Sequence, residues 1–457
     1  MRSSPKNKLL KLHPAVLVLI SFLSVIFLGT LLLMLPLSTK NEPITFINAL
    51  FTATSAVCVT GLTVVDTGTF FTLFGQGVIL LLIQIGGLGV TTISVALFRW
   101  IGKSISIRQR MAMQDTFAHT PRKDIIDLVK NIIFVTLGIE CIGAILLALF
   151  WFEEFPFFKA VYYALFHSIS AFCNAGFSLF PENLMRYSDH AGVVGTVATL
   201  IIVGGIGFPV LYEIQSWTSR RTTRKKLSIH TKAVLWTTLI LIVGGALLLA
   251  MLEYPTHAEP GFFSGFALDA LFQSITCRTA GFNTIDIASL HDASLAVMIF
   301  LMFFGASPGS CGGGVKTTTL ALLTAFAYSR LTRQQRVNMF KKSIPTETLY
   351  RGTALILLAT TIVALVTFML LAGETTGAIT TPGPHRMFLP YLFETVSAFG
   401  TVGLSMGVTP LLGAWSKSWI ILTMLVGRVG VLTFSYIVVG DGAGRRKEYA
   451  EENMMIG

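Results

Sequence analysis

The sequence predicts an all-α integral membrane protein made of four parallel repeats around a pseudo-fourfold axis. Each repeat would contain a long helix, a short helix with its loop, and a second long helix. Three observations predict this fold. The composition is too apolar for a soluble protein, long and short apolar segments alternate, and one glycine-containing motif recurs four times after the short segments.

The composition is unlike that of an ordinary soluble protein. The chain has 457 residues, of which 53% are hydrophobic and only 12% are charged, and its mean hydropathy is +0.72. Soluble globular proteins carry about 25% charged residues. Apolar runs of about 20 residues are typical of transmembrane helices. We therefore expect one membrane-embedded body with short loops instead of several soluble domains.

Eight apolar runs are each long enough to cross a bilayer, which takes about 20 residues. They fall into four pairs, and two complete crossings return the chain to the side on which the pair began. The four units would therefore be parallel, unlike the inverted repeats of many secondary transporters. We expect eight full transmembrane spans near 13–35, 72–98, 128–152, 191–215, 233–253, 291–329, 352–373 and 417–439.

A shorter apolar segment lies between the two runs of each pair. At about 13–16 residues it would be roughly 20–24 Å long as a helix, which is too short to span comfortably. Segments of this length are often re-entrant or interfacial elements. We expect four half-spanning helices at 44–57, 157–172, 262–275 and 387–399.

A short motif ending in glycine and an apolar residue follows each half-spanning segment. The copies read SAVCVTGL at 55–62, SAFCNAGF at 170–177, SITCRTAGF at 274–282 and SAFGTVGL at 397–404. A second glycine-rich landmark begins 24 to 28 residues after each motif glycine, at Gly86, Gly204, Gly305 and Gly427. Two landmarks at near-constant spacing divide the chain into repeats at 1–100, 101–220, 221–345 and 346–457.

The motif loops have the chemistry of a cation-selective pore. A half-spanning helix directs C-terminal carbonyls, which carry about half a negative charge, to the middle of the membrane. Glycine adopts positive φ and so can turn carbonyls inward, and rings of carbonyls replace the hydration shell of K⁺ in selectivity filters. A lone Thr-Val-Gly is usually a tight turn, but four aligned copies favour a filter in pore loops 44–62, 157–178, 262–283 and 387–405. K⁺, and no transition metal, would bind carbonyl oxygens among Cys58, Val59, Thr60, Gly61, Cys173, Asn174, Ala175, Gly176, Arg278, Thr279, Ala280, Gly281, Gly400, Thr401, Val402 and Gly403.

The sixth long run, 291–329, is too long for one straight span. Its 39 residues would measure about 58 Å as a helix, nearly twice a hydrocarbon core of about 30 Å. A stretch with five glycines and one proline in ten residues, 305–314, predicts a break. We expect a mobile intramembrane gate; a static kink filled by a neighbouring helix is the alternative. The gate residues would be Gly305, Ala306, Ser307, Pro308, Gly309, Ser310, Cys311, Gly312, Gly313, Gly314, Lys316 and Arg428.

Arg428 stands where the first two landmarks have a second glycine. An intramembrane charge is costly unless it faces water or pairs with protein oxygens. We expect Arg428 to hold the 305–314 loop closed through its carbonyls or the hydroxyls of Ser307 and Ser310, and to add a positive barrier to cations.

The placement of charge indicates the orientation in the membrane and excludes nucleic acid as a partner. The net charge is +11, but Lys and Arg cluster in segments that alternate with acidic ones, which is the positive-inside pattern. We expect a multi-pass protein of the cell membrane with both termini in the cytoplasm, where anionic lipids would also meet these charges. The basic clusters are 2–11, 99–130, 220–232, 330–351 and 445–447.

The sequence does not resemble an enzyme. Its five cysteines include no C-x-x-C pair, so we expect free buried thiols. The segment 309–317 resembles a phosphate-binding loop, but Val315 separates Gly314 from Lys316 where that motif requires them to be adjacent. We therefore expect no nucleotide on this chain.

Five polar residues inside apolar segments are ambiguous. We expect His167 to be a core residue and Arg278 to point away from the ion path. Glu140 lies in the third long run without an obvious partner. Asp269 and Glu394 lie on half-spanning helices and would either attract cations at the outer mouth or pair with protein groups.

The four motif loops, the GGLG and GGIG landmarks and the GRVG near the C-terminus resemble the Trk/Ktr/HKT superfamily of K⁺ transporters. The likeness covers about residues 13–440 and is greatest to the membrane subunit, of the KtrB or KtrD type, of bacterial Ktr systems. It implies K⁺ as the transported ion, since a serine at the first filter glycine accompanies Na⁺ selectivity in some plant members. It further implies a homodimer on a cytosolic ring of nucleotide-binding regulatory subunits, KtrA- or KtrC-like, and uptake stimulated by Na⁺.

Two mechanisms remain open at this point. A pore conducts ions through a continuous path, whereas an ion-coupled carrier would share the apolar composition and the broken helix. The parallel two-crossing repeat favours a pore over a carrier.

Overall fold

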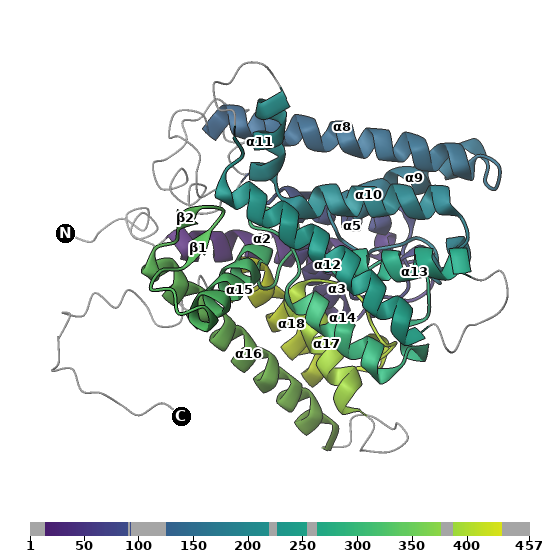
Figure 1. Cartoon of the computed structure of the whole chain (residues 1–457). Helices are drawn as coiled ribbons and strands as arrows, with labels where there is room; N and C mark the ends of the chain where they lie inside the picture. The colour runs from purple at the N-terminus through teal and green to yellow at the C-terminus, as the bar shows by residue number, and fades with distance from the viewer. Residues whose placement is uncertain are drawn as a thin grey trace, which may run out of the picture.

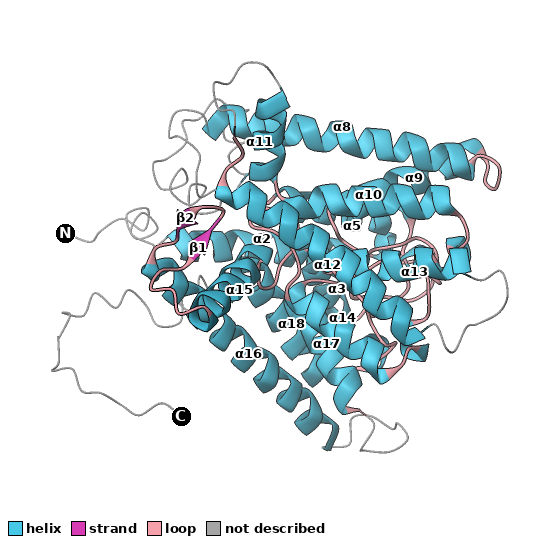
Figure 2. Ribbon diagram, in the orientation of Figure 1, coloured by secondary structure: helices cyan, strands magenta, loops and turns pink. Residues whose placement is uncertain are grey.

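The computed structural model describes residues 14–89, 92, 125–218, 226–253, 263–375 and 387–431. This part of the chain is almost entirely helical, with one short two-stranded hairpin (Figures 1 and 2). Within these described ranges, four helices are long and apolar enough to cross a membrane, and one further bent pair of helices would make a fifth span. The long helices begin the four predicted repeats; they are α2 (Pro14–Leu33), α8 (Ile125–Trp151), α12 (Ile229–Glu253) and α16 (Thr346–Thr375).

Each predicted half-spanning segment forms a short helix at the expected place. These helices have 13 to 16 residues and lie mostly buried at their C-terminal ends. Their bounds agree with the sequence predictions to within a residue or two. They are α3 (Phe46–Cys58), α9 (Phe157–Phe172), α13 (Phe263–Thr276) and α17 (Phe388–Gly400).

The second long helix of each predicted repeat is shorter than expected. The predicted continuous span 191–215 is wrong, because the chain bends by 95° between Ile206 and Phe208. The helices predicted over 72–98 and 417–439 end at Leu88 and Val429, and most residues beyond lie outside the described part. The second helices are α5 (Leu73–Leu88), α10 (Ala191–Ile206), α14 (Asp292–Phe303) and α18 (Ala414–Val429), and α11 (Phe208–Thr218) and α15 (Thr317–Leu331) follow two of them.

The last glycine of each GGLG-type landmark ends its helix. Gly89, Gly207 and Gly430 directly follow α5, α10 and α18, with φ of +85°, +100° and +96°. Such φ values leave the right-handed helix and favour glycine. A helix therefore ends at this glycine in three repeats, and in the second repeat α11 follows directly after it. Among the described residues, the predicted break between α14 and α15 is longer than the single residue that separates α10 from α11.

Contacts between helices recur from one predicted repeat to the next. The half-length helices α3, α9, α13 and α17 each pack against the long helix that precedes them in the chain. In addition, α5 packs on α9, α10 on α13, α14 on α17, and α18 returns to α3. Since α5, α10, α14 and α18 each follow one half-length helix in the chain and pack on the next, these four contacts connect the half-length helices in a cyclic order.

The remaining elements are short. The helix α4 (Thr67–Phe70) and the 3₁₀ helices η1 (Pro36–Ser38), η2 (Met185–Tyr187), η4 (Ile287–Ser289) and η6 (Thr409–Leu411) lie in connections. The strands β1 (Asn338–Met339) and β2 (Lys342–Ser343) form an antiparallel hairpin between α15 and α16. Large apolar side chains remain exposed along the long helices, including Phe134, Ile145, Leu247 and Phe368, as expected for surfaces that face lipid.

Candidate functional site

The four motif loops share one backbone conformation. The residue two before each motif glycine is left-handed, with φ of +57° at Val59, +58° at Asn174, +74° at Thr279 and +50° at Thr401. The motif glycines also have positive φ, between +69° and +94°. Non-glycine residues rarely adopt such values, so the same unusual turn occurs four times. The sixteen predicted filter residues are buried except Gly403, which is half-buried.

Hydrogen bonds to the end of the half-length helix hold three of these turns in the same way. Backbone amides of Thr60, Ala175 and Val402 donate to the carbonyls of Ser55, Ser170 and Ser397 at 2.7 to 2.8 Å. The hydroxyls of Ser55 and Ser397 also accept from the amides of Gly61 and Gly403 at 3.1 and 3.0 Å. The third loop differs, since Ala280 donates to Thr276, four residues before it.

The four motif glycines touch one another in a closed cycle. A Cβ atom added to Gly61 would lie 2.5 Å from the carbonyl oxygen of Ala175 and 3.0 Å from the Cα of Gly176. Gly176 meets Gly281, Gly281 meets Gly403, and Gly403 meets Gly61 in the same way, with Cβ to Cα distances of 2.9 to 3.1 Å. Each added Cβ atom would also lie 2.2 to 2.8 Å from a carbonyl oxygen of the neighbouring loop, which is closer than real Cβ atoms come. Only glycine therefore allows the four loops to surround a common centre at this distance.

The break between α14 and α15 lies against two of these loops. The amide of Gly313 donates to the hydroxyl of Thr401 at 2.7 Å. A Cβ atom on Gly312 would overlap Thr279. The amide of Ser307 donates to the carbonyl of Gly205 at 3.2 Å. The 304–316 segment thus contacts loops three and four and the landmark of the second repeat.

Two positive side chains bind carbonyl groups of this region. Arg428 donates to the carbonyl oxygens of Cys311 and Gly86, so the expected pairing with a loop carbonyl is confirmed. The expected pairing with hydroxyls is not found among the described contacts: the hydroxyl of Ser310 donates to the carbonyl of Ser307 at 2.7 Å, and the hydroxyl of Ser307 accepts from that of Thr317.

Lys316 stabilises the same loop from its other end. Its ammonium group donates to the carbonyl oxygens of Gly312 at 2.7 Å and Gly313 at 3.3 Å. Carbonyls freed by the helix break are therefore bound by cationic side chains, as buried polar groups require. Lys316 and Arg428 therefore place two basic side chains beside the segment that contacts loops three and four.

Arg278 points away from the other loops, as expected. Its guanidinium group donates to the hydroxyl of Thr238 on α12 at 3.2 Å, and the side chain is only 4% exposed. The positive charge therefore lies behind the third loop, where it does not face the centre of the glycine cycle.

Glu394 and His167 occupy equivalent positions in two repeats. Each lies nine residues before its motif glycine and bonds the serine two residues after it. Glu394 accepts from Ser405 at 2.5 Å and from Thr409 at 2.7 Å, whereas His167 Nε2 lies 3.0 Å from Ser178 Oγ. These contacts favour the pairing role for Glu394. Sequence reasoning missed the equivalence, although the common offset from the motif glycine could have revealed it.

Glu140 has partners that the sequence did not indicate. Its carboxylate accepts from the amide of Gln84 on α5 at 3.1 Å and from the thiol of Cys173 at 3.7 Å. The side chain is 2% exposed. It therefore links the third long run to the second loop from behind.

Comparisons with known proteins show the family and the fold of the chain. The sequence profile of the family described as TrkH, cation transport protein, matches residues 6–439. The chain is 40% identical to the Ktr system potassium uptake protein B of Bacillus subtilis, over 94% of this chain and 95% of that protein. It is 36% identical to the potassium/sodium uptake protein NtpJ of Enterococcus hirae, over 98% of both chains. The crystal structure of the potassium transporter TrkH from Vibrio parahaemolyticus has the same fold, with a TM-score of 0.73 at 20% identity over 94% of this chain and 85% of that one.

Proposed function

The chain belongs to the TrkH family of cation transport proteins. We propose that it carries K⁺ into the cell through a pore between its four motif loops. The observation that carries the proposal is the closed cycle of Gly61, Gly176, Gly281 and Gly403 at the ends of four half-length helices. Its central space is bounded by backbone, which is the kind of ligand that K⁺ filters use.

Helix dipoles would favour a cation at this centre. Four C-terminal helix ends, each with about half a negative charge, converge on the loops. The carbonyl oxygens of residues 58–61, 173–176, 278–281 and 400–403 would then replace the hydration shell of K⁺. In the proposed architecture each repeat crosses the membrane twice. The long helix that begins each repeat lies at the periphery of the protein, where its apolar side chains face lipid.

The segment between α14 and α15 would be the gate. Its contacts with Thr279 and Thr401 place it next to the pore loops, and Arg428 and Lys316 bind its carbonyls. A closed loop held by two cations would both obstruct K⁺ and repel it. Opening would require the loop to leave these partners, so each hydrogen bond to it stabilises the closed state.

Control of the gate would come from a separate cytosolic partner. The exposed basic side chains Arg330, Arg333, Arg336, Lys341 and Lys342 surround the β1–β2 hairpin. They are suited to contact a nucleotide-binding regulatory ring, with anionic lipid as the alternative. The relatives named as parts of a Ktr system support such a partner, and NtpJ, named for potassium and sodium, supports a role for Na⁺. We further propose a homodimer; the tail around 445–447 lies outside the described residues.

Uptake by a bacterium deficient in K⁺ transport tests the filter. The wild-type chain should restore growth at low K⁺. Gly61→Ser should restore it poorly and raise Na⁺ sensitivity, because its Cβ would meet Ala175 and its φ of +93° disfavours a side chain. Full growth with unchanged Na⁺ sensitivity would refute this filter. Single-channel steps in a planar bilayer would support a pore, and strict stoichiometric coupling would support a carrier.

Deletion of 306–313 tests the gate in proteoliposomes. The deletion variant should pass K⁺ faster and depend less on the regulatory partner, because the obstruction and the Cys311 carbonyl bound by Arg428 are removed. A well-folded deletion variant with slow and fully partner-dependent flux would contradict the gate.

A further inference from the structure

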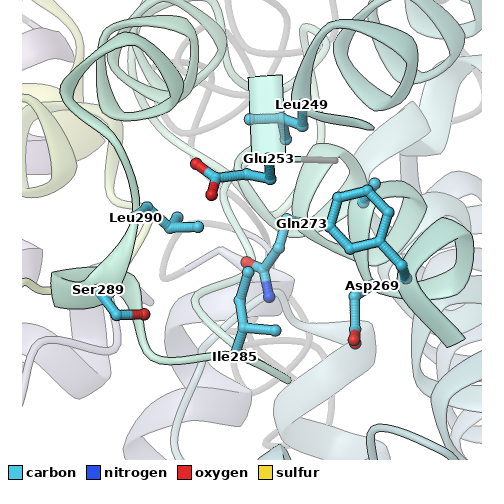
Figure 3. Close-up of a pocket in the computed structure, with 9 residues that line it drawn as sticks. Leu249, Glu253, Asp269, Gln273, Ile285, Ser289 and Leu290 are labelled. Carbon is cyan, nitrogen blue, oxygen red and sulfur yellow. The ribbon is translucent and has the colours of Figure 1, made fainter. Parts of the chain in front are cut away.

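A cavity of about 120 Å³ lies between α12, α13 and the segment that follows the third motif loop (Figure 3). Its walls are mainly apolar and include Leu249, Phe266 and Leu290. Two carboxylates, Glu253 and Asp269, also line it. The lining contains no Lys or Arg, so the cavity combines negative charge with an apolar interior.

Gln273 supplies the observation that points to a ligand. Its side chain is 1% exposed, and its amide nitrogen donates to the hydroxyl of Thr284 at 3.4 Å. The amide oxygen has no hydrogen-bond partner among the described residues. Figure 3 shows Gln273 between Glu253 and Asp269. Because buried acceptors are nearly always hydrogen-bonded, this oxygen is suited to a donor inside the cavity.

Both carboxylates accept hydrogen bonds from neighbouring protein groups. Glu253 accepts from the amide and from the ring nitrogen of His291, each at 3.0 Å. Asp269 accepts from the hydroxyl of Thr284 at 2.5 Å. A carboxylate offers about four lone-pair sites, so the bond from Thr284 leaves Asp269 able to accept from a ligand as well. A ligand would therefore meet up to three acceptors, two of them anionic.

The balance of walls and acceptors selects the chemical class. A hard metal ion prefers about six or more oxygen ligands, and the described residues contain no cluster of three or more His, Cys, Asp or Glu suited to a metal. The waters around a hydrated metal ion would face the apolar side chains of Leu249 and Leu290, which offer them no hydrogen bonds. A protonated primary amine offers three N–H donors to the acceptors and an alkyl chain to the apolar walls.

We propose that this cavity binds a primary ammonium group attached to a short apolar chain. The ammonium group would donate to Gln273 Oε1 and to the carboxylates of Glu253 and Asp269. Phe266 and Leu249 would pack on the chain. The ligand could come from a free alkylamine or from the ethanolamine headgroup of a lipid, since both present this chemistry. Because α13 carries the third motif loop, the site adjoins the proposed filter but does not depend on it.

Calorimetric binding of n-butylammonium chloride to the full chain tests the proposal. The protein would be placed in phosphatidylcholine nanodiscs with saturating K⁺, which would displace an amine bound at a filter. We expect saturable binding and a Kd at least about tenfold weaker for Gln273→Leu and for Asp269→Asn, as the loss of a charge-assisted hydrogen bond implies. Asp286→Asn is the matched control, because Asp286 is exposed on the segment 285–290 but does not line the cavity.

Butyltrimethylammonium is the matched ligand control, because it keeps the charge and chain but has no N–H donor. It should bind at least about tenfold more weakly than butylammonium. If butylammonium binds more weakly in phosphatidylethanolamine nanodiscs, the lipid headgroup competes for the cavity and is the source of the ligand. If its binding is unchanged there, the ligand is a free amine. Absence of saturable binding, equal binding of the two ligands, or no effect of Gln273→Leu and Asp269→Asn would overturn the proposal. If Gln273→Leu does not fold, butylammonium binding by the nearly isosteric Asp269→Asn variant decides whether the proposal stands.

Discussion

Gly204 of α10 lies directly against the carbonyl oxygen of Phe172, the last residue of α9, so that a Cβ atom at Gly204 would overlap that oxygen. Gly86 has the same relationship to Val57, and Gly427 to Phe399. In all three cases the carbonyl belongs to the residue four before the motif glycine. The first landmark glycine therefore lets the second helix approach the end of the half-length helix, where it supports the motif loop.

This relationship predicts that Gly204→Ala destabilises the protein. Added bulk in a close-packed site costs about 1–3 kcal/mol, and here the obstacle is backbone. Gly195→Ala in the same helix is the matched control, since a Cβ atom there would have no neighbour within 4 Å. Its higher helix propensity should leave stability unchanged or raise it by up to about 1 kcal/mol. Thermal unfolding in detergent would measure both, and equal melting temperatures would contradict the packing role of Gly204.

Thr401→Val should loosen the proposed gate. The variant keeps the β-branched shape at a left-handed position but removes the acceptor that binds the amide of Gly313 at 2.7 Å. An unsatisfied buried amide costs about 1–3 kcal/mol, which would shift the gate towards the open state. We expect faster K⁺ flux in proteoliposomes without the regulatory partner.

Thr423→Val is the control for this variant, because the hydroxyl of Thr423 bonds only the carbonyl of Trp419 within its own helix among the contacts described. It should leave the flux unchanged. Equal flux in wild type and Thr401→Val would show that the bond to Gly313 does not hold the gate.

Glu394→Leu should destabilise the fourth loop. Glu394 is fully buried and accepts from Ser405, from the amide of Met406 and from Thr409. Removing the carboxylate leaves these donors unpaired, at a cost of about 1–3 kcal/mol or more. Glu347→Leu is the control, since Glu347 is 75% exposed and its ion pair with Arg351 contributes about 0.5 kcal/mol or less. Unfolding midpoints would show whether Glu394 is the more costly of the two to lose.

The sequence predicts the half-length helices well because their signals are local. An apolar segment of fixed length and a glycine after it suffice to locate α3, α9, α13 and α17. The break at Gly207 was not predicted, because the apolar pattern continues through it. The break depends on the φ of one glycine and on the contact of Phe208 with Gly309.

Partners that are distant in the chain could not be predicted. Glu140 meets Gln84, 56 residues away, and Arg428 meets Gly86, 342 residues away. Such pairs arise only when repeats pack against one another. The sequence could show that these charges need oxygen or amide partners, but the choice of partner is a property of the assembled helices.

Cysteine labelling tests the proposed orientation. A cysteine replacing Arg333, exposed between α15 and α16, should react only with reagents supplied from the cytoplasm. One replacing Glu182, exposed between α9 and α10, should react from outside. The background would carry Cys141→Ser, because Cys141 is the one exposed cysteine of the five. Labelling of both positions from the same side would contradict the positive-inside orientation.

The central claim is that K⁺ passes between the four motif loops, and anomalous X-ray scattering from Tl⁺, which replaces K⁺ in many filters, tests it most directly. Crystals grown in Tl⁺ should show anomalous density at the centre of the cycle formed by Gly61, Gly176, Gly281 and Gly403, within ligand distance of their carbonyl oxygens. Density at other sites alone, in a protein that transports Tl⁺ in liposomes, would contradict the claim.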